Sequence, residues 1–70
     1  MNPVEIKVLM LRKGLTQEKV AELAEYTISA VNVAINQGAG SDRLLKAIAR
    51  VLEREPCELW PERFPEREAA

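Results

Sequence analysis

The chain of 70 residues has no histidine and a single cysteine, Cys57. One cysteine cannot form a disulfide within the chain, and the common metal-binding sets of histidine and cysteine are missing. No pair of nucleophile and general base is recognisable either. We therefore expect no enzymatic activity, no metal and no cofactor. The cysteine usage fits a reducing compartment, so we expect a cytoplasmic protein.

Long apolar runs are also missing. The N-terminal segment is interrupted by Glu5 and Lys7 and has no small-residue cleavage site, so it is not predicted to be a signal peptide. No apolar stretch approaches the roughly 20 residues that a membrane-spanning helix needs. Internal repeats and the alternation typical of strands are absent. These absences predict an all-α domain with no membrane partner.

Neither sign of charge predominates over the whole chain, but the two signs are unevenly distributed along it. The net charge is −1. Up to Leu52, seven basic residues stand against five acidic ones, whereas from Glu53 onward three arginines stand against six glutamates. The body is therefore slightly basic and the C-terminal part acidic, which leaves the body able to face a polyanion.

The stretch 16–36 has the pattern of two short helices joined by a tight turn. Thr16 and Thr27 are suitable N-caps because a hydroxyl accepts the free N–H groups of a first helical turn. Apolar residues at helical spacing follow each cap: Val20, Ala21 and Ala24, then Ala30, Val31, Ala34 and Ile35. Small residues allow close helix approach, so this stretch predicts a helix-turn-helix.

Further helices are predicted on both sides of this pair. Asn2 caps a helix over 3–13 that Gly14 ends, Ser41 caps a fourth helix, and Pro56 starts a short fifth one. We expect 37–40 to form a flexible connection, 1–64 to form the domain and 65–70 to form a flexible tail. The predicted inward residues are Ile6, Leu9, Met10 and Leu11, then Leu44 or Leu45 with Ile48, Ala49 and Leu52, and finally Leu59 and Trp60.

The segments GLTQEKVAELA, VNVAIN, LLKAIARVL and PCELWPERF resemble the Cro/C1 (XRE-type) helix-turn-helix family, and the last resembles the Ner-type phage regulators. The resemblance covers Ile6 to Phe64. It implies a compact five-helix, lambda-repressor-like DNA-binding domain. It also implies a sequence-specific transcriptional regulator, a phage or prophage repressor in the cytoplasm of a bacterial or phage-infected cell. Its implied partner is double-stranded DNA, bound as a homodimer, with no small-molecule substrate.

Three positions depart from that family's pattern. Glu25 occupies the turn position where the family usually has glycine, so a left-handed glutamate is expected there. Met10 and Ile35 stand where many relatives join the first and third helices by an Arg–Glu pair, which predicts an apolar contact instead. The second helix of the pair, with the sequence ISAVNVAIN, carries no Arg, Lys or Gln.

By position, the resemblance implies base contacts from the second helix of the pair. Asn32 can pair bidentately with adenine, Ser29 can hydrogen-bond several bases, and Ile28 can touch a thymine methyl group. The full set of predicted base-contact residues is Thr27, Ile28, Ser29, Asn32 and Val33. The alternative is that Ser29 and Asn32 are ordinary solvated residues, and that Ile28 and Val33 form a patch for a protein partner.

Phosphate contacts are predicted at Gln17, Asn36, Arg43 and Lys46. The alternative for Arg43 and Lys46 is an ordinary charged helix face. Trp60 is predicted to cover the core rather than to stack on a base. The rival function is a protein-interaction module, built on the same helix-turn-helix, that binds a protein and not DNA.

Overall fold

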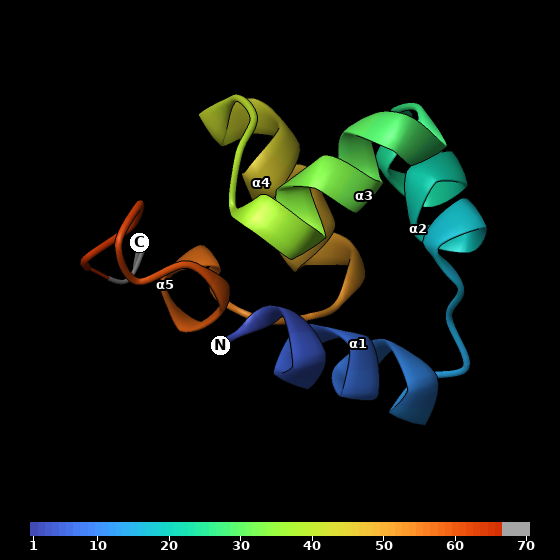
Figure 1. The fold of residues 1–70 in the computed structure, drawn as a ribbon, viewed down its shortest axis with the longest axis horizontal. Helices are drawn as coiled ribbons and strands as arrows, with labels where there is room; N and C mark the ends of the chain where they lie inside the picture. The colour runs from blue at the N-terminus through green and yellow to red at the C-terminus, as the bar shows by residue number, and fades with distance from the viewer. Residues whose placement is uncertain (67–70) are drawn as a thin grey trace.

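Five helices follow one another along residues 1–66, which are the residues described by the computed structural model (Figure 1). They are α1 Pro3–Arg12, α2 Gln17–Ala24, α3 Ile28–Gln37, α4 Asp42–Val51 and α5 Pro56–Leu59. No strand occurs in this part of the chain. The predicted all-α fold is confirmed. The predicted tail, 65–70, lies mostly outside the described residues and stays a prediction.

Side chains cap the start of each of the first four helices. The Asn2 side chain accepts from the Glu5 amide at 2.8 Å, while the Glu5 carboxylate accepts from the Asn2 amide at 2.8 Å. Thr16, Thr27 and Ser41 accept in the same way from the amide three residues on, at 3.1, 3.1 and 3.2 Å. Each such cap contributes about 1 kcal/mol. The four predicted N-caps are therefore confirmed.

The helices α1, α2 and α4 share one kind of C-terminal end, built on a residue in the left-handed conformation. These residues are Gly14 (φ 69°), Glu25 (φ 63°) and Glu53 (φ 58°). In each case the next amide donates to a carbonyl five residues back: Leu15 to Met10 at 2.8 Å, Tyr26 to Ala21 at 2.9 Å and Arg54 to Ala49 at 3.0 Å. This bond satisfies carbonyls that a helix end leaves free. The predictions for Gly14 and Glu25 are confirmed, and Glu53 is a third case that the sequence analysis missed.

The core is apolar and draws on all five helices. Met10 of α1 and Ile35 of α3 are 3% and 1% exposed and belong to the same buried cluster. Leu44 and Leu45 are both buried, and Trp60 and Phe64 close the core from the C-terminal side. The indole Nε1 of Trp60 is buried without a hydrogen-bond partner among the described residues. No charged or polar residue is buried within residues 1–66.

Two details differ from the expectations. Leu11 is 77% exposed and not inward-facing. Its direction on α1 lies about 100° from that of Met10, on a side where no other helix packs. Gln37 belongs to the last turn of α3, so the connection to α4 begins one residue later than predicted and covers 38–41. None of the helices among residues 1–66 is long and apolar enough to span a membrane.

Packing between the helices positions α2 and α3 as a pair. The two helices contact each other and both contact α4, while α1 packs on α3 and α5 on α4. Figure 1 shows α1 along the lower edge of the molecule, with α5 beside its N-terminal end. There the amino group of Met1 donates to the carbonyls of Glu58 and Leu59, at 2.7 and 3.1 Å. The outer face of the α2–α3 pair is thus left open.

Candidate nucleic-acid interface

The predicted base-contact residues all lie on the exposed side of α3 or at its start. Thr27 is the N-cap, and its hydroxyl oxygen accepts from the Ala30 amide, so its O–H hydrogen remains available to an acceptor. Ile28 and Val33 are 49% and 40% exposed. Ser29 and Asn32 are exposed as well. The predicted set therefore shares one surface.

A chain of amide side chains links α2 to α3 on this surface. The Asn32 Nδ2 donates to Gln17 Oε1 at 3.0 Å, across 15 residues of sequence. Asn36 Nδ2 in turn donates to Asn32 Oδ1 at 3.0 Å and to the Asn32 carbonyl at 2.9 Å. Asn36 lies in the last turn of α3. The structure thus brings Gln17, Asn32 and Asn36 together in one network.

This network fixes the orientation of the Asn32 amide without using all of its hydrogen bonds. A primary amide has two N–H hydrogens and an oxygen with two lone pairs. One hydrogen and one lone pair of Asn32 are used by Gln17 and Asn36, and one of each remains. A bidentate contact with adenine uses one amide hydrogen and one lone pair, which is the number that Asn32 keeps.

Basic residues follow one another on α4 next to the turn of the helix pair. Arg43, Lys46 and Arg50 are exposed and line an open hollow with Glu25 and Tyr26. Lys46 also lies over the Phe64 ring, with its Nζ 5.9 Å from the ring centroid. Arg43 lies in the first turn of α4, and Lys46 makes a cation–π contact with Phe64 as well as lining the hollow.

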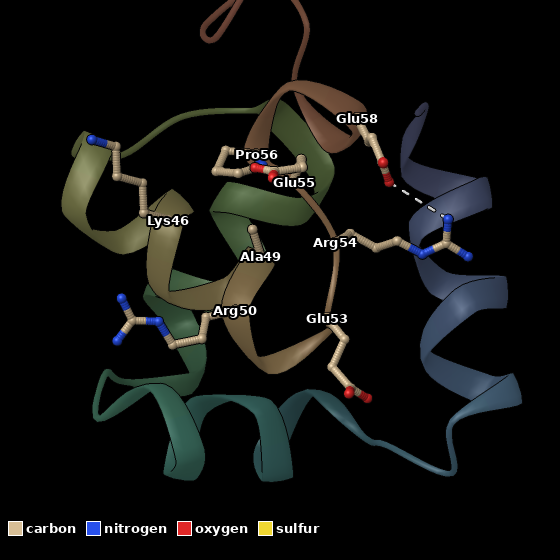
Figure 2. A pocket seen from close by; sticks show the side chains of 8 residues that line it. All are labelled: Lys46, Ala49, Arg50, Glu53, Arg54, Glu55, Pro56 and Glu58. Atoms are coloured by element: carbon tan, nitrogen blue, oxygen red, sulfur yellow. Dashed lines mark ion pairs between the residues drawn. The ribbon is translucent and has the colours of Figure 1, made fainter. Parts of the chain in front are cut away.

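The far end of α4 has mixed charge. A second open hollow is lined there by Lys46, Ala49, Arg50, Glu53, Arg54, Glu55, Pro56 and Glu58 (Figure 2). Arg54 pairs with Glu58 at 3.5 Å, and Figure 2 shows Lys46 and Arg50 pointing away from that pair. Three glutamates and three basic residues line this hollow, whereas one glutamate and three basic residues line the hollow beside the α2–α3 turn. The excess of positive charge on α4 therefore lies on the side facing that turn.

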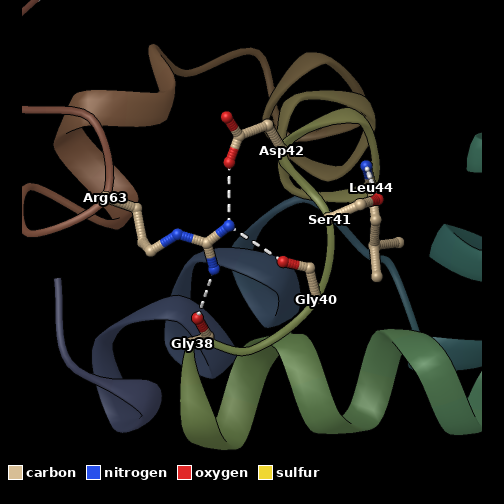
Figure 3. A network of polar contacts seen from close by, with 6 residues as sticks. All are labelled: Gly38, Gly40, Ser41, Asp42, Leu44 and Arg63. Carbon is tan, nitrogen blue, oxygen red and sulfur yellow. Dashed lines mark hydrogen bonds and ion pairs between the residues drawn. The ribbon is translucent and has the colours of Figure 1, made fainter.

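Arg63 holds the connection between α3 and α4. Its guanidinium donates to the carbonyls of Gly38 and Gly40, at 3.0 and 2.8 Å, and to the Asp42 carboxylate at 2.8 Å (Figure 3). Gly40 has φ 125°, and a Cβ there would lie 2.8 Å from Leu44 Cδ2. The connection expected to be flexible is therefore held in place by a side chain more than 20 residues away.

Two residues of this surface were missed by the sequence analysis. The spacing of Arg50 from Arg43 and Lys46, at i+7 and i+4, gave a signal that could have found it. Arg63 gave no local signal, because its partners are 21 to 25 residues distant. No group of histidine, cysteine, aspartate and glutamate able to hold a metal ion occurs among residues 1–66.

Comparison with known proteins bears on the same surface. No curated protein and no solved structure matches the chain. A family model described as winged helix-turn-helix DNA-binding matches residues 1–70. The match supports a helix-turn-helix domain and does not single out the Cro/C1 or Ner-type regulators, so those resemblances stay predictions. Residues 1–66 contain no strands from which the wing of such a domain is usually built. The chain belongs to the winged helix-turn-helix DNA-binding family.

Proposed function

We propose that this DNA-binding chain is a sequence-specific transcriptional regulator of the phage or prophage repressor type. In this proposal the segment 27–36, largely α3, enters the major groove of double-stranded DNA, and two copies bind a pseudo-palindromic site. The base contacts come from Thr27, Ile28, Ser29, Asn32 and Val33, and the phosphate contacts from Gln17, Asn36, Arg43 and Lys46. The protein acts without catalysis, in the cytoplasm.

The observation that carries the proposal is the amide network on the open side of the helix pair. Asn32 is held from both sides by Gln17 and Asn36, yet keeps one donor and one acceptor for a base edge. Holding the side chain in place before binding reduces the conformational entropy that is lost on binding. Because α3 has no basic residue, in this proposal α3 contacts the base edges and the basic residues of α4 contact the phosphates.

Phosphate contacts are supported by position and charge. Gln17 is the first residue of α2, where free N–H groups and the helix dipole favour an anion. Arg43 is exposed in the first turn of α4. The body up to Leu52 carries seven basic and five acidic residues, a net charge of +2, which favours contact with the DNA backbone.

The test compares one base-reading residue with two charged ones. A preferred site is first selected from a random oligonucleotide pool, and affinities for that site and for random DNA are then measured across a salt series. Asn32→Ala should cost about 1–3 kcal/mol on the preferred site and little on random DNA. Arg43→Ala and Lys46→Ala should weaken both DNAs similarly and reduce the salt slope by about one unit each.

Asn36→Ala tests the network separately from the Asn32 amide. It removes a predicted phosphate contact and the donor that orients the Asn32 oxygen, so we expect it to weaken both DNAs and to lower the ratio of specific to random binding by less than Asn32→Ala does. An unchanged ratio of specific to random binding in Asn32→Ala would exclude base reading through Asn32. If the wild type binds no sequence more tightly than random DNA, sequence-specific regulation is excluded.

A second candidate function is a protein-interaction module. The observation that favours it is the exposure of two apolar side chains of α3, Ile28 and Val33. Exposed apolar surface of this kind can mark a protein interface. Salt separates the two candidates, because binding through phosphate contacts weakens steeply with salt whereas an apolar protein contact hardly changes.

A further inference from the structure

The outer face of α1 carries a stripe of exposed apolar side chains. Val4, Val8 and Leu11 are 67%, 40% and 77% exposed. They are separated by four and then three residues within α1, which ends at Arg12. Steps that alternate between four and three residues are the spacing of the contact positions in a two-helix coiled coil. The stripe therefore has the period needed to contact another helix.

The charges beside the stripe favour a second copy of α1 in one orientation. In the coiled-coil frame, Glu5 and Arg12 occupy equivalent e positions one heptad apart, and Lys7 occupies a g position. An antiparallel pair places e beside e, so Glu5 of each copy faces Arg12 of the other. A parallel pair places g beside e, which brings Lys7 against Arg12. Opposite charges thus select the antiparallel pair and like charges oppose the parallel one.

The same alignment also pairs the apolar residues. When Glu5 faces Arg12, Val8 packs beside Leu11 of the second copy, and Val4 lies past the C-terminal end of the facing helix, which stops at Arg12. Lys7 then lies on the side of the stripe away from Arg12, where the facing α1 has no other charged g position. One oxygen of the Glu5 carboxylate accepts from the Asn2 amide, which leaves the other for Arg12. Charge and apolar contacts are therefore satisfied together, twice by symmetry.

We propose that this chain associates with itself through α1, as an antiparallel pair related by a two-fold axis. The proposal concerns the protein alone, and it holds or fails independently of DNA binding. A helix of ten residues offers less surface than the roughly 1,600 Å² of a standard interface. We therefore expect a weak dimer, with a dissociation constant on the order of 10–100 μM.

Sedimentation equilibrium of the full chain without DNA, from about 1 μM to 1 mM, tests the association. Leu11→Glu should raise the dissociation constant by at least about tenfold. Leu23→Glu, at an apolar residue of α2 that is 52% exposed, is the matched control and should leave the constant unchanged. Both side chains are exposed, so the variants should keep the melting temperature of the wild type. A wild type that stays monomeric, or a dimer that Leu11→Glu does not weaken, would overturn the proposal.

Disulfide formation tests the orientation. In a Cys57→Ser background, Val8→Cys and Leu11→Cys chains are mixed and oxidised. The antiparallel pair should favour the mixed disulfide over either homodimeric one, because residue 8 of one copy lies beside residue 11 of the other. Preferred homodimeric disulfides at both positions would overturn the antiparallel arrangement.

Charge reversal tests the proposed ion pairs. Arg12→Glu should weaken the dimer about tenfold, because it places two carboxylates side by side where Glu5 otherwise faces a guanidinium. Lys7→Glu is the matched control, since it reverses a charge on the same helix but on the side of the stripe away from the Glu5–Arg12 pairs, and it should have little effect. Equal weakening by the two variants would overturn the antiparallel charge pairing.

Discussion

At the scale of single residues, two glutamates occupy left-handed positions at helix ends, where glycine is the usual residue. Glu25 and Glu53 adopt φ values of 63° and 58° at helix ends, where a side chain with a Cβ is crowded by the following carbonyl. Glu53 forms an exposed ion pair with Lys13 at 3.1 Å, which contributes little to stability. Both positions therefore carry backbone strain that the hydrogen bonds of the helix end outweigh.

Replacing Glu25 by glycine should stabilise the fold. The Glu25 side chain is exposed, so Glu25→Gly removes strain of up to about 1 kcal/mol without losing a buried group. Glu25→Ala is the matched control: it removes the same charge but keeps the Cβ, so we expect no such gain. The measurement is the free energy of unfolding from denaturant titration of all three proteins. Equal stability of the glycine and alanine variants would contradict the role of strain.

At the scale of elements, the connection from α3 to α4 depends on a residue of the C-terminal segment. Arg63 donates to two carbonyls of the connection and to Asp42 at the start of α4. The guanidinium is planar and offers donors in a fixed fork, so it can satisfy these acceptors at once. The segment after α5 therefore helps to set how α4 follows the predicted reading helix.

Removing this guanidinium should cost stability and loosen the connection. Arg63→Ala should lower the free energy of unfolding by about 1–2 kcal/mol, because it removes charge-assisted hydrogen bonds that are partly solvent-screened. Arg63→Lys should recover only part of the loss, since an ammonium lacks the fork. Amide exchange of residues 38–41 should rise in Arg63→Ala. Unchanged exchange there would mean that the connection holds its conformation without Arg63.

At the scale of the whole molecule, α1 and α3 are held together by apolar packing. Met10 and Ile35, for which the sequence resemblance predicts an apolar contact, are both buried in one cluster. A buried ion pair must be desolvated, whereas apolar side chains of similar volume have no such cost. The core of this small domain therefore contains no buried charge within the described residues.

Truncating one side of this packing should destabilise the whole domain. Ile35→Ala leaves a cavity at a residue that is 1% exposed, so it should cost about 2–5 kcal/mol. Ile35→Val removes a single methyl group and should cost only about 0.5–1.5 kcal/mol. Thermal unfolding followed by circular dichroism measures both. A loss below about 1 kcal/mol for Ile35→Ala would show that Ile35 is not part of the central packing.

Helix starts and ends could be predicted from the amino-acid sequence because their signals are local. A cap such as Asn2 or Thr27 acts on amides within three residues, and Gly14 or Glu25 acts on carbonyls within five. The buried apolar face of each helix could also be predicted, because α-helical geometry repeats every 3.6 residues. The family resemblance supplied the set of candidate contacts, which only a DNA-binding experiment tests.

The packing of the helices decides which surfaces are covered and which residues distant in sequence come into contact. Leu11 is apolar, as core residues are, yet among the described residues no helix packs on its side of α1. The pairing of Gln17 with Asn32 and the attachment of Arg63 to the 38–41 connection join residues 15 to 25 positions apart. Such contacts arise only in the folded domain, because the chain between the partners carries no local pattern that specifies their meeting.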